Sequence, residues 1–479
     1  MILTIDQGTT SSRAIIFDID GSVINSKQEE YPLIYPQNGW VEIDPEKLLE
    51  SVTNTLKNFQ SLKIDCAAIT NQRETTIVWD KDTGKAIYNA IVWQDRRTDQ
   101  YCSSIGSPAL KEQILNKTGL ILDPYFSATK IKWILDNVEG ARDKAKQGKL
   151  LFGTVDTYLM YKLSNHTIHK TDFTNASRTM LFNIHACEWD QDLLDLFDIP
   201  ASMLPEVMPS DSSFGSLEIM NNIKVRAVLG DQHAALFGQH CINKGDLKST
   251  YGTGCFLMVN TGHEIVKSSS GLLTTIGYAF NGEVNYALEG SIYSAGTITQ
   301  WLRDQLMFFE TAKDSENFLN DSLLSNEVFF VPAFNGLGAP YWDSNVRGSF
   351  HGLTRDTNKN DLTTAALASI SFQTKDIIAT LQKDNIQVEK LKIDGGMVEN
   401  DWFTKHLATS INRSVLIPDN KESTALGVAM MAGIASGLCS EDVLAQAKTR
   451  EVTAVTEKSK EVLAEYEACL LYTSDAADE

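Results

Sequence analysis

The sequence contains a strand, a glycine turn and a second strand twice, and this repeat limits the possible folds more than any other feature. The first copy is apolar up to Ile5, turns at residues 6–12 and continues as a mostly apolar run at 13–17. The second copy places two strand-like runs, within residues 245–259, around the turn 251–254. Two such hairpins far apart in one chain indicate two α/β domains.

The length of the chain agrees with this division. At 479 residues it exceeds the size at which one hydrophobic core stops growing, which is about 250 to 300 residues. We place the boundary near residue 241, between the two copies of the pattern. Residues 1–241 then form the N-terminal domain and residues 242–479 the C-terminal domain.

Helix-like and strand-like segments alternate between the two copies. Asp44 followed by Pro45 is typical of a helix N-cap and first helical position, and apolar residues at helical spacing come after them. Residues 66–70 form an apolar run that predicts a buried strand. Residues 75–79 and 86–93 flank a polar turn, and we expect them to form a second hairpin.

A third glycine turn, residues 394–396, follows the strand-like run 391–393. The first turn begins with the carboxylate of Asp6 and is rich in backbone amides and hydroxyls, which are the groups that a Mg²⁺-bound polyphosphate needs. Each turn taken alone could equally be an ordinary hairpin turn. Three of them at strand ends favour an ATP-binding cleft, because their amides can converge where two sheets face each other.

The composition argues against several other classes of function. The net charge of −20 and the pI near 4.9 disfavour a nucleic-acid partner, which requires clustered Lys and Arg. The seven cysteines include no C-x-x-C pair, as expected for reduced thiols. The N-terminus lacks the basic flank of a signal peptide, and no apolar run is long enough to span a membrane. We therefore expect a cytoplasmic protein.

Seven segments carry a resemblance to a known family. They are residues 71–79, 91–98, 123–127, 152–157, 174–180, 230–232 and 334–342. Their order resembles that of the FGGY carbohydrate kinases of the actin-like ATPase superfamily, and within that family they are similar to the glycerol kinases. The resemblance covers residues 1 to about 437. It implies an α/β fold with two ribonuclease H-like domains and a cleft between them.

The resemblance also implies a reaction, in which ATP and Mg²⁺ serve to phosphorylate glycerol to sn-glycerol 3-phosphate. Glycerol has three hydroxyls on a short carbon spine, so its site should combine charged hydrogen-bond partners with one apolar wall. The family pattern assigns Arg73, Glu74, Tyr125, Asp231 and Gln232 to the hydroxyls, and Trp93 and Phe256 to the spine. Judged singly, the Arg73–Glu74 pair is more often a surface ion pair, and such aromatic residues more often belong to a core.

Asp231 is the expected catalytic base, because the family places this aspartate beside the attacking hydroxyl. The alternative is a helix N-cap before residues 234–237. The resemblance assigns Thr9, Thr10, Ser11, Arg13 and Thr253 to the phosphates of the nucleotide, and Gly296, Gln300, Gly396 and Asn400 to the rest of its site. Asp6 would hold Mg²⁺ through water.

Two parts of the chain depart from the family pattern. The stretch 217–224 is short and lacks the Gly-rich, Arg-bearing loop of relatives that respond to fructose 1,6-bisphosphate, so we expect no such control. Residues from about 469 to 479 do not continue the usual last helix, and we assign them no function. Relatives are commonly dimers or tetramers, and we expect a homodimer or homotetramer here.

Two other functions remain open. A kinase for another polyol or sugar, such as xylulose or gluconate, would keep the ATP turns but lose the Arg73–Glu74 and Trp93 segments. A non-catalytic actin-like ATPase, or a relative that senses sugar without turnover, should lack Asp231. The chain has all of these residues.

Overall fold

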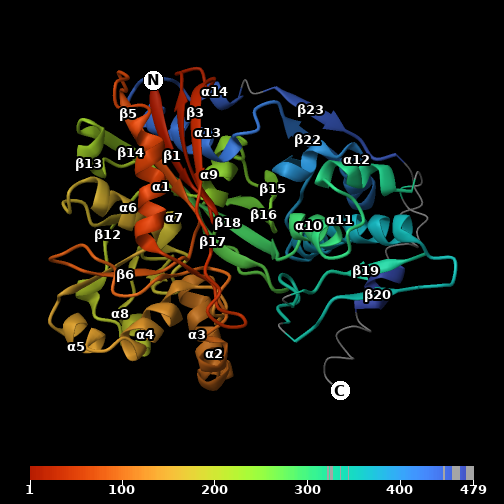
Figure 1. Ribbon diagram of the computed structural model, residues 1–479, viewed down its shortest axis with the longest axis horizontal. Coiled ribbons are helices and arrows are strands. Elements are labelled where there is room, and N and C mark those ends of the chain that lie inside the picture. Colours follow the sequence, from red (N-terminus) through yellow and green to blue (C-terminus); the bar gives the residue numbers. More distant parts are fainter. Residues whose placement is uncertain are drawn as a thin grey trace.

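The computed structural model describes residues 1–320, 323, 327–334, 336–343, 345–445, 448–455 and 464–470. Two large sheets lie side by side, one in each half of the chain, with helices packed around them (Figure 1). Among the described residues, no helix combines the length and apolar character needed to cross a bilayer. The tail 471–479, to which we assigned no function, lies outside the described residues.

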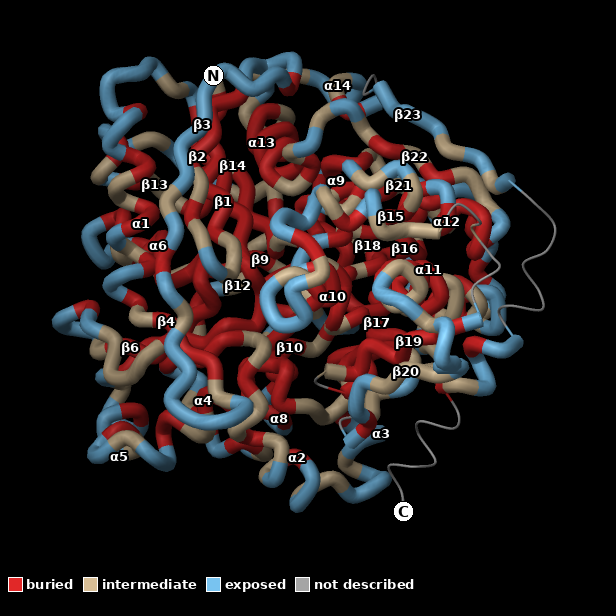
Figure 2. The backbone as a smooth tube through the Cα atoms, turned by 45° about the vertical axis from the view of Figure 1, so that its right-hand side comes forward, coloured by how far each residue is buried: buried red, intermediate tan, exposed pale blue. Residues whose placement is uncertain are grey.

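The first sheet has the strand order β13-β14-β5-β1-β2-β3. Its strands are β1 (Ile2–Gln7), β2 (Ser11–Phe17), β3 (Val23–Glu30), β5 (Cys66–Asn71), β13 (Gly215–Leu217) and β14 (Ile223–Gly230). The predicted opening hairpin is present, since β1 pairs antiparallel with β2 and parallel with β5. Strands β1 and β5 are buried throughout, whereas β3 forms an exposed edge (Figure 2).

The second sheet has the order β17-β18-β16-β15-β21-β22-β23. Its strands are β15 (Leu247–Tyr251), β16 (Cys255–Gly262), β17 (Leu273–Phe280), β18 (Glu283–Ile292), β21 (Lys390–Asp394), β22 (Ser414–Pro418) and β23 (Thr449–Val452). Strand β15 pairs antiparallel with β16 and parallel with β21. This is the arrangement of β1 with β2 and β5, so the sequence repeat is also a repeat of topology.

Five two-stranded sheets complete the strand pairings of the described chain. They pair β4 (Glu42–Ile43) with β7 (Ala90–Ile91), β6 (Ile77–Asp80) with β8 (Leu150–Gly153), β9 (Lys170–Asp172) with β12 (Glu206–Met208), β10 (Phe182–Asn183) with β11 (Glu188–Trp189), and β19 (Phe329–Val331) with β20 (Ser349–His351). The predicted second hairpin forms in part. Antiparallel bridges join Thr76 to Ile91 and Trp79 to Ala86, and the Ile87 amide donates a backbone hydrogen bond to Val78. The regular ladders, however, pair each arm with a strand that is distant in sequence.

Helices alternate with the strands along the described chain. They are α1 (Pro45–Lys57), α2 (Asp99–Ile105), α3 (Pro108–Thr118), α4 (Ser127–Asn137), α5 (Ala141–Lys146), α6 (Val155–Leu163), α7 (Phe173–Ala176), α8 (Gln191–Phe197), α9 (Asp231–Gly238), α10 (Gly296–Asp304), α11 (Lys359–Lys383), α12 (Asp401–Ile411), α13 (Ser423–Ala435) and α14 (Asp442–Ala445). The predicted start of α1 is confirmed, because the Asp44 side chain accepts a hydrogen bond from the Glu46 amide and Pro45 is the first helical residue.

Helix α13 links the two halves. Although it comes late in the chain, it packs against α9 and against strands β1, β5 and β14 of the first sheet. A Cβ atom at Gly427 would lie only 2.0 Å from the Ala234 carbonyl oxygen, so glycine is required for this close approach. One hydrophobic cluster joins residues of both halves, among them Phe17, Met258 and Met430.

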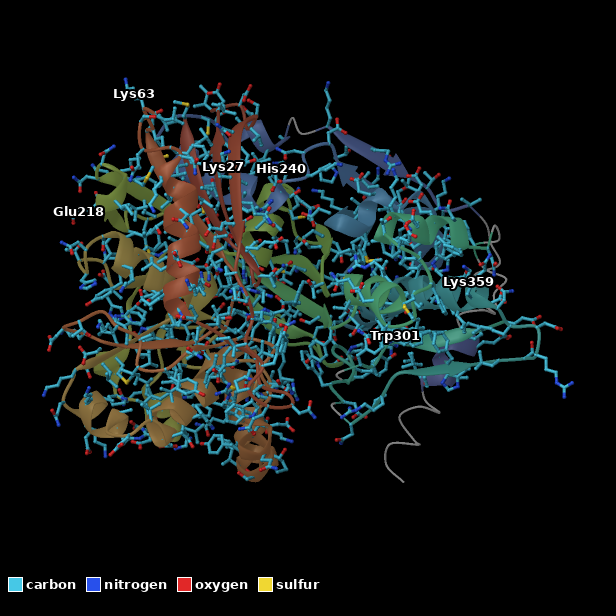
Figure 3. The ribbon with its side chains drawn as sticks, viewed as in Figure 1. Lys27, Lys63, Glu218, His240, Trp301 and Lys359 are labelled. Carbon is cyan, nitrogen blue, oxygen red and sulfur yellow. The ribbon has the colours of Figure 1, made fainter. Side chains whose placement is uncertain are left out.

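The connection between β13 and β14 is compact. It consists of the short 3₁₀ helix Glu218–Met220 followed by Asn221 and Asn222, both with positive φ. Leu217 and Met220 are buried beneath it. Glu218 lies at the outer edge of the N-terminal half (Figure 3). The departure from the family pattern in this stretch is therefore a tight hairpin.

Candidate active site

A cavity of about 170 Å³ lies where the carboxyl ends of β5 and β14 meet the turn between β15 and β16. It is lined by Thr9, Arg73, Glu74, Trp93, Tyr125, Asp231, Gln232, Thr250, Gly252, Thr253, Gly254 and Phe256. The lining contains all seven residues that the sequence pattern assigned to glycerol, together with Thr9 and Thr253 of the nucleotide set. The volume suits a small acceptor, because pockets for drug-sized ligands usually exceed about 300 Å³.

The Arg73–Glu74 pair is not a surface ion pair. Both residues come shortly after the carboxyl end of β5 and are buried. Arg73 donates from Nη1 to Glu289 Oε2 at 2.5 Å and from Nη2 to Glu289 Oε1 at 3.2 Å. Arg178 donates from Nη2 to the same Glu289 at 2.9 Å and from Nε to Glu74 Oε1 at 2.6 Å. Two arginines and two glutamates thus alternate in one buried network.

Glu289 is the centre of this network and was missed in the sequence. It lies on β18, in the other half of the chain from Arg73, and is fully buried. The two guanidinium groups outweigh the effect of burial and hold the pKa of Glu289 well below its usual value. Arg178 stood within the quoted segment 174–180 but had no assigned role. No local pattern in the sequence marks either partnership, since more than a hundred residues separate each pair.

Asp231 is the first residue of α9 and follows β14 directly, with Gly230 as the N-cap. The N-cap alternative for Asp231 is therefore wrong. Its Oδ1 accepts a hydrogen bond from the Gln232 amide at 2.7 Å and lies 3.4 Å from Arg73 Nε. Burial raises the pKa of Asp231 to about 6, against the opposing effect of Arg73. A carboxylate with this pKa is mostly ionised at neutral pH and can still accept a proton.

The backbone beside Asp231 and Arg73 is tightly fitted. A Cβ atom at Gly230 would approach the Arg73 Cγ atom to 2.8 Å, so glycine leaves room for the arginine stem. Glu74 adopts φ 58°, which is uncommon for a residue with a side chain and carries a cost in backbone strain. This conformation allows the neighbouring Arg73 and Glu74 side chains to enter the same buried network.

Three aromatic rings form the apolar part of the lining. The Trp93 ring packs edge-on against Tyr125 at 5.9 Å and against Phe256 at 5.8 Å between centroids. Trp93 Nε1 donates to Thr9 Oγ1 at 3.0 Å, which links this wall to the first glycine turn. Burial raises the pKa of the Tyr125 hydroxyl well above its usual value, so Tyr125 stays a neutral hydrogen-bonding group.

The second and third glycine turns adjoin one another. The carbonyl oxygen of Gly252 accepts a hydrogen bond from the Gly296 amide at 2.9 Å, and that of Thr253 accepts one from the Ala295 amide at 3.1 Å. Both amides lie at the start of α10. Gly395 lies against the Tyr251 backbone. The structure thus brings the predicted Thr253 and Gly296 together.

Seven of the nine predicted nucleotide residues lie outside the cavity lining. They are Thr10, Ser11, Arg13, Gly296, Gln300, Gly396 and Asn400. Thr10, Gln300 and Gly396 are exposed. The Asn400 side chain caps α12 by accepting a hydrogen bond from the Phe403 amide at 2.8 Å. That bond occupies its amide oxygen and leaves its N–H groups for other partners.

Asp6 and Arg13 form an ion pair with each other, and Arg13 also pairs with Glu422 at 2.5 Å. The carboxylate assigned to Mg²⁺ and the guanidinium assigned to phosphate are therefore neighbours across the β1–β2 hairpin. A second buried carboxylate, Asp394, ends β21, and its Oδ1 has no hydrogen-bond partner. Burial raises the pKa of Asp394. Within the part of the chain that the structure describes, no group of three or more potential metal ligands occurs.

Comparison with known proteins identifies the family. The models of the N-terminal and C-terminal domains of the FGGY family of carbohydrate kinases match residues 1–238 and 247–436. A glycerol kinase from Alteromonas mediterranea is 53% identical over 447 residues, which are 91% of this chain and 90% of that protein. The chain belongs to the glycerol kinases of the FGGY family. A glycerol kinase from a Marinomonas species is 51% identical over 446 residues, with the same coverage.

Solved structures agree with this membership. The glycerol kinase of Plasmodium falciparum with ADP superposes with a TM-score of 0.90 at 34% identity and covers 98% of both chains. A xylulose kinase from Lactobacillus acidophilus superposes with a TM-score of 0.86 at 22% identity, covering 100% of this chain and 98% of its own, which shows the shared fold alone. The expected fold of two FGGY-type α/β domains is confirmed.

Proposed function

We infer that this member of the glycerol kinases transfers the γ-phosphoryl group of ATP to a terminal hydroxyl of glycerol and releases sn-glycerol 3-phosphate and ADP. One observation carries the inference beyond family membership. A cavity of about 170 Å³ places charged hydrogen-bond partners, an aromatic wall and the phosphate-type turns next to one another. Nothing larger than a short polyol is needed to fill it, and every hydroxyl of glycerol would find a polar partner there.

The roles of the lining residues follow from their chemistry. Asp231 orients the attacking hydroxyl and accepts its proton late, as the oxygen–phosphorus bond forms, because an alcohol is far less acidic than a carboxylic acid. Arg73 and Glu74 bind the remaining hydroxyls and are held in place by Arg178 and Glu289. Trp93 and the neighbouring aromatic rings cover the carbon spine and exclude water.

The nucleotide would lie along the glycine turns. We propose that Thr9, Thr10, Ser11, Arg13 and Thr253 contact its phosphates, with Gly296, Gln300, Gly396 and Asn400 around the remainder. Mg²⁺ would neutralise charge on the transferring phosphoryl group. The buried carboxylates fit such an ion, because Mg²⁺ is usually bound by one or two carboxylates together with phosphate oxygens and water. Asp6 is the expected ligand, through water, and the unpaired Oδ1 of Asp394 is suited to the same task.

Four broader proposals concern the domains, the oligomeric state, the location and the partner of the chain. We propose two domains divided near residue 241, which is supported by the position of that residue between the strands of the two sheets. We propose a homodimer or homotetramer, and a cytoplasmic location, by analogy with relatives. Glycerol is the proposed small-molecule partner, and the acidic surface disfavours nucleic acid.

A substrate panel tests the proposed function. ADP release is measured with glycerol, dihydroxyacetone, erythritol and xylulose as acceptors. We expect kcat/KM for glycerol to exceed that for xylulose by orders of magnitude, because a poorly fitting acceptor leaves buried polar groups unpaired. Equal turnover of xylulose and glycerol would favour the rival sugar kinase. Glycerol binding without any acceptor-dependent ADP release would favour a non-catalytic relative.

A further inference from the structure

Lys248 lies beneath the cavity and takes no part in the roles assigned so far. It belongs to β15 and is 0% exposed. Its ammonium group donates to Gln232 Oε1 at 2.6 Å, to Thr250 Oγ1 at 3.1 Å and to the Phe256 carbonyl oxygen at 3.3 Å. Three donors thus have three acceptors, and each acceptor belongs to a residue of the cavity lining.

The contact with Gln232 fixes the direction of its side-chain amide. An amide group has an oxygen that accepts hydrogen bonds and an NH₂ group that donates them, whereas an ammonium group only donates. The atom of Gln232 that meets Lys248 must therefore be the oxygen. The bond occupies that oxygen, and the NH₂ group remains as the polar end that Gln232 can offer to a ligand.

The charge of Lys248 is supported in its buried position. Burial lowers the pKa of Lys248 from its usual value, whereas the carboxylates of Asp394 and Asp231 favour the charged form. A charged donor makes a stronger hydrogen bond than a neutral one, by roughly a factor of two in energy. Rotation of the Gln232 amide by half a turn would place its NH₂ group against the ammonium group, so the amide has one favourable orientation.

We propose that Lys248 is a positioning residue that makes Gln232 a hydrogen-bond donor to the acceptor substrate. The substrate hydroxyl oxygen accepts a hydrogen bond from Gln232 Nε2, and its own proton then points to the neighbouring carboxylate of Asp231. Lys248 thereby helps to select the hydroxyl orientation from which the proton can leave. This inference rests on the proposed phosphorylation of glycerol. It adds which partner donates and which accepts in one hydrogen bond between the protein and the substrate.

A double-mutant cycle tests the proposal. Lys248→Met removes the ammonium group but keeps the aliphatic stem. We expect it to lower kcat/KM for glycerol by about ten- to hundredfold, the range of one hydrogen bond to a charged group, with KM for ATP unchanged. In the Gln232→Ala background the same substitution should change kcat/KM by no more than about twofold, because Lys248 acts through Gln232.

The other outcomes overturn the proposal. Equal losses in both backgrounds would mean that Lys248 acts independently of Gln232, and no loss in either would mean that it does not act at all. Gln232→Glu is a second test, which does not require the Lys248 variant to fold. It keeps an oxygen for Lys248 but has no N–H donor, so kcat/KM for glycerol should fall about as far as in Gln232→Ala, and retention within about twofold would refute the donor assignment.

Lys392 supplies a matched control. It stands beside Lys248 in the register of β15 and β21 and is also largely covered, but its ammonium group donates to the carbonyl oxygens of Gln239 at 2.9 Å and His240 at 2.8 Å, away from the cavity. Lys392→Met should lower the melting temperature and leave kcat/KM for glycerol unchanged. Turnover of glycerol by the unmodified protein tests the proposed function by itself. A failure of the proposed function can therefore be distinguished from a failure of the role proposed for Lys248.

Discussion

The substitution Asp231→Asn separates a catalytic role of this residue from a structural one. It keeps the shape of the side chain and removes the charge and the proton acceptor. Asp231 is the first residue of α9 and not its N-cap, so the helix loses no capping group. Arg73 keeps its two hydrogen bonds to Glu289 after the change. The fold around the site should therefore survive.

The expected loss of activity follows from the role as a base. General-base catalysis typically contributes about a hundredfold to ten-thousandfold, or roughly 3 to 5 kcal/mol of barrier, so kcat should fall by that order. The pH dependence gives a second measure. Asp231 accepts a proton only when it is ionised, so kcat/KM of the unmodified protein should fall as the pH drops below about 6. The residual activity of Asp231→Asn should lack this acid limb.

Asp231→Asn should not lower the stability of the protein, although it should lower the activity. The folded-state pKa of Asp231, about 6, lies above the usual value of about 3.9 for aspartate, so the contribution of this residue to stability is full below about pH 4 and is lost as the pH rises through 6. Each pKa unit corresponds to about 1.4 kcal/mol, so ionised Asp231 costs on the order of 2 to 3 kcal/mol at neutral pH. Asn carries no such cost, and the melting temperature of Asp231→Asn should match or exceed that of the unmodified protein.

The assay combines three measurements on the purified variant: kcat with glycerol, the dissociation constant of ATP and the melting temperature. Lost turnover with intact ATP affinity and an equal or higher melting temperature is the expected result. Near-normal turnover in a folded variant would refute the assignment of Asp231 as the base. A lowered melting temperature with normal turnover would point to a purely structural residue.

Two further predictions concern stability and regulation. Glu289→Gln removes the negative charge that Arg73 and Arg178 share, and it should lower the free energy of unfolding by about 3 to 5 kcal/mol in urea titrations. Glu283→Gln, at an exposed position of the same strand, should change the free energy of unfolding by no more than about 0.5 kcal/mol. Equal effects of the two substitutions would contradict the buried network. The short hairpin 217–224 should leave activity insensitive to fructose 1,6-bisphosphate at fixed ATP and glycerol, and saturable inhibition below millimolar concentration would show that the hairpin was misinterpreted.

Local patterns in the sequence predicted the repeated part of the fold correctly. The β1–β2 and β15–β16 hairpins were predictable because a glycine turn between two apolar runs specifies its own pairing. The arms at residues 75–79 and 86–93 have the same local appearance and are joined by antiparallel bridges, but the sheet partner of β6 is β8 and that of β7 is β4. Their partners lie elsewhere in the chain, and hydrophobic alternation does not encode which distant strand will be the neighbour.

The residues that line the cavity were easier to predict than the residues that hold them in place. Residues such as Arg73 and Asp231 stand in recognisable segments, and the structure brings them together in one cavity. Glu289 and Lys248 stand in ordinary strand contexts, where only burial distinguishes them, and Arg178 lies in a recognisable segment that gives no sign of its partners. A buried charge must find a partner, but the sequence does not show which residue this is when the two are separated by a hundred positions or more.

The buried network makes the acceptor site depend on the packing of both halves. Arg73 comes from the first sheet region and Glu289 from β18 in the second, and neither side chain reaches solvent. Two buried guanidinium groups would be costly without the carboxylate that both of them contact, because removal of one partner of a buried ion pair typically costs about 3 to 5 kcal/mol. Arg73 can therefore be held toward the acceptor only while β18 lies beside it. For this reason the place of Arg73 in the cavity lining could be predicted from its own segment, whereas the group that makes its position stable could not.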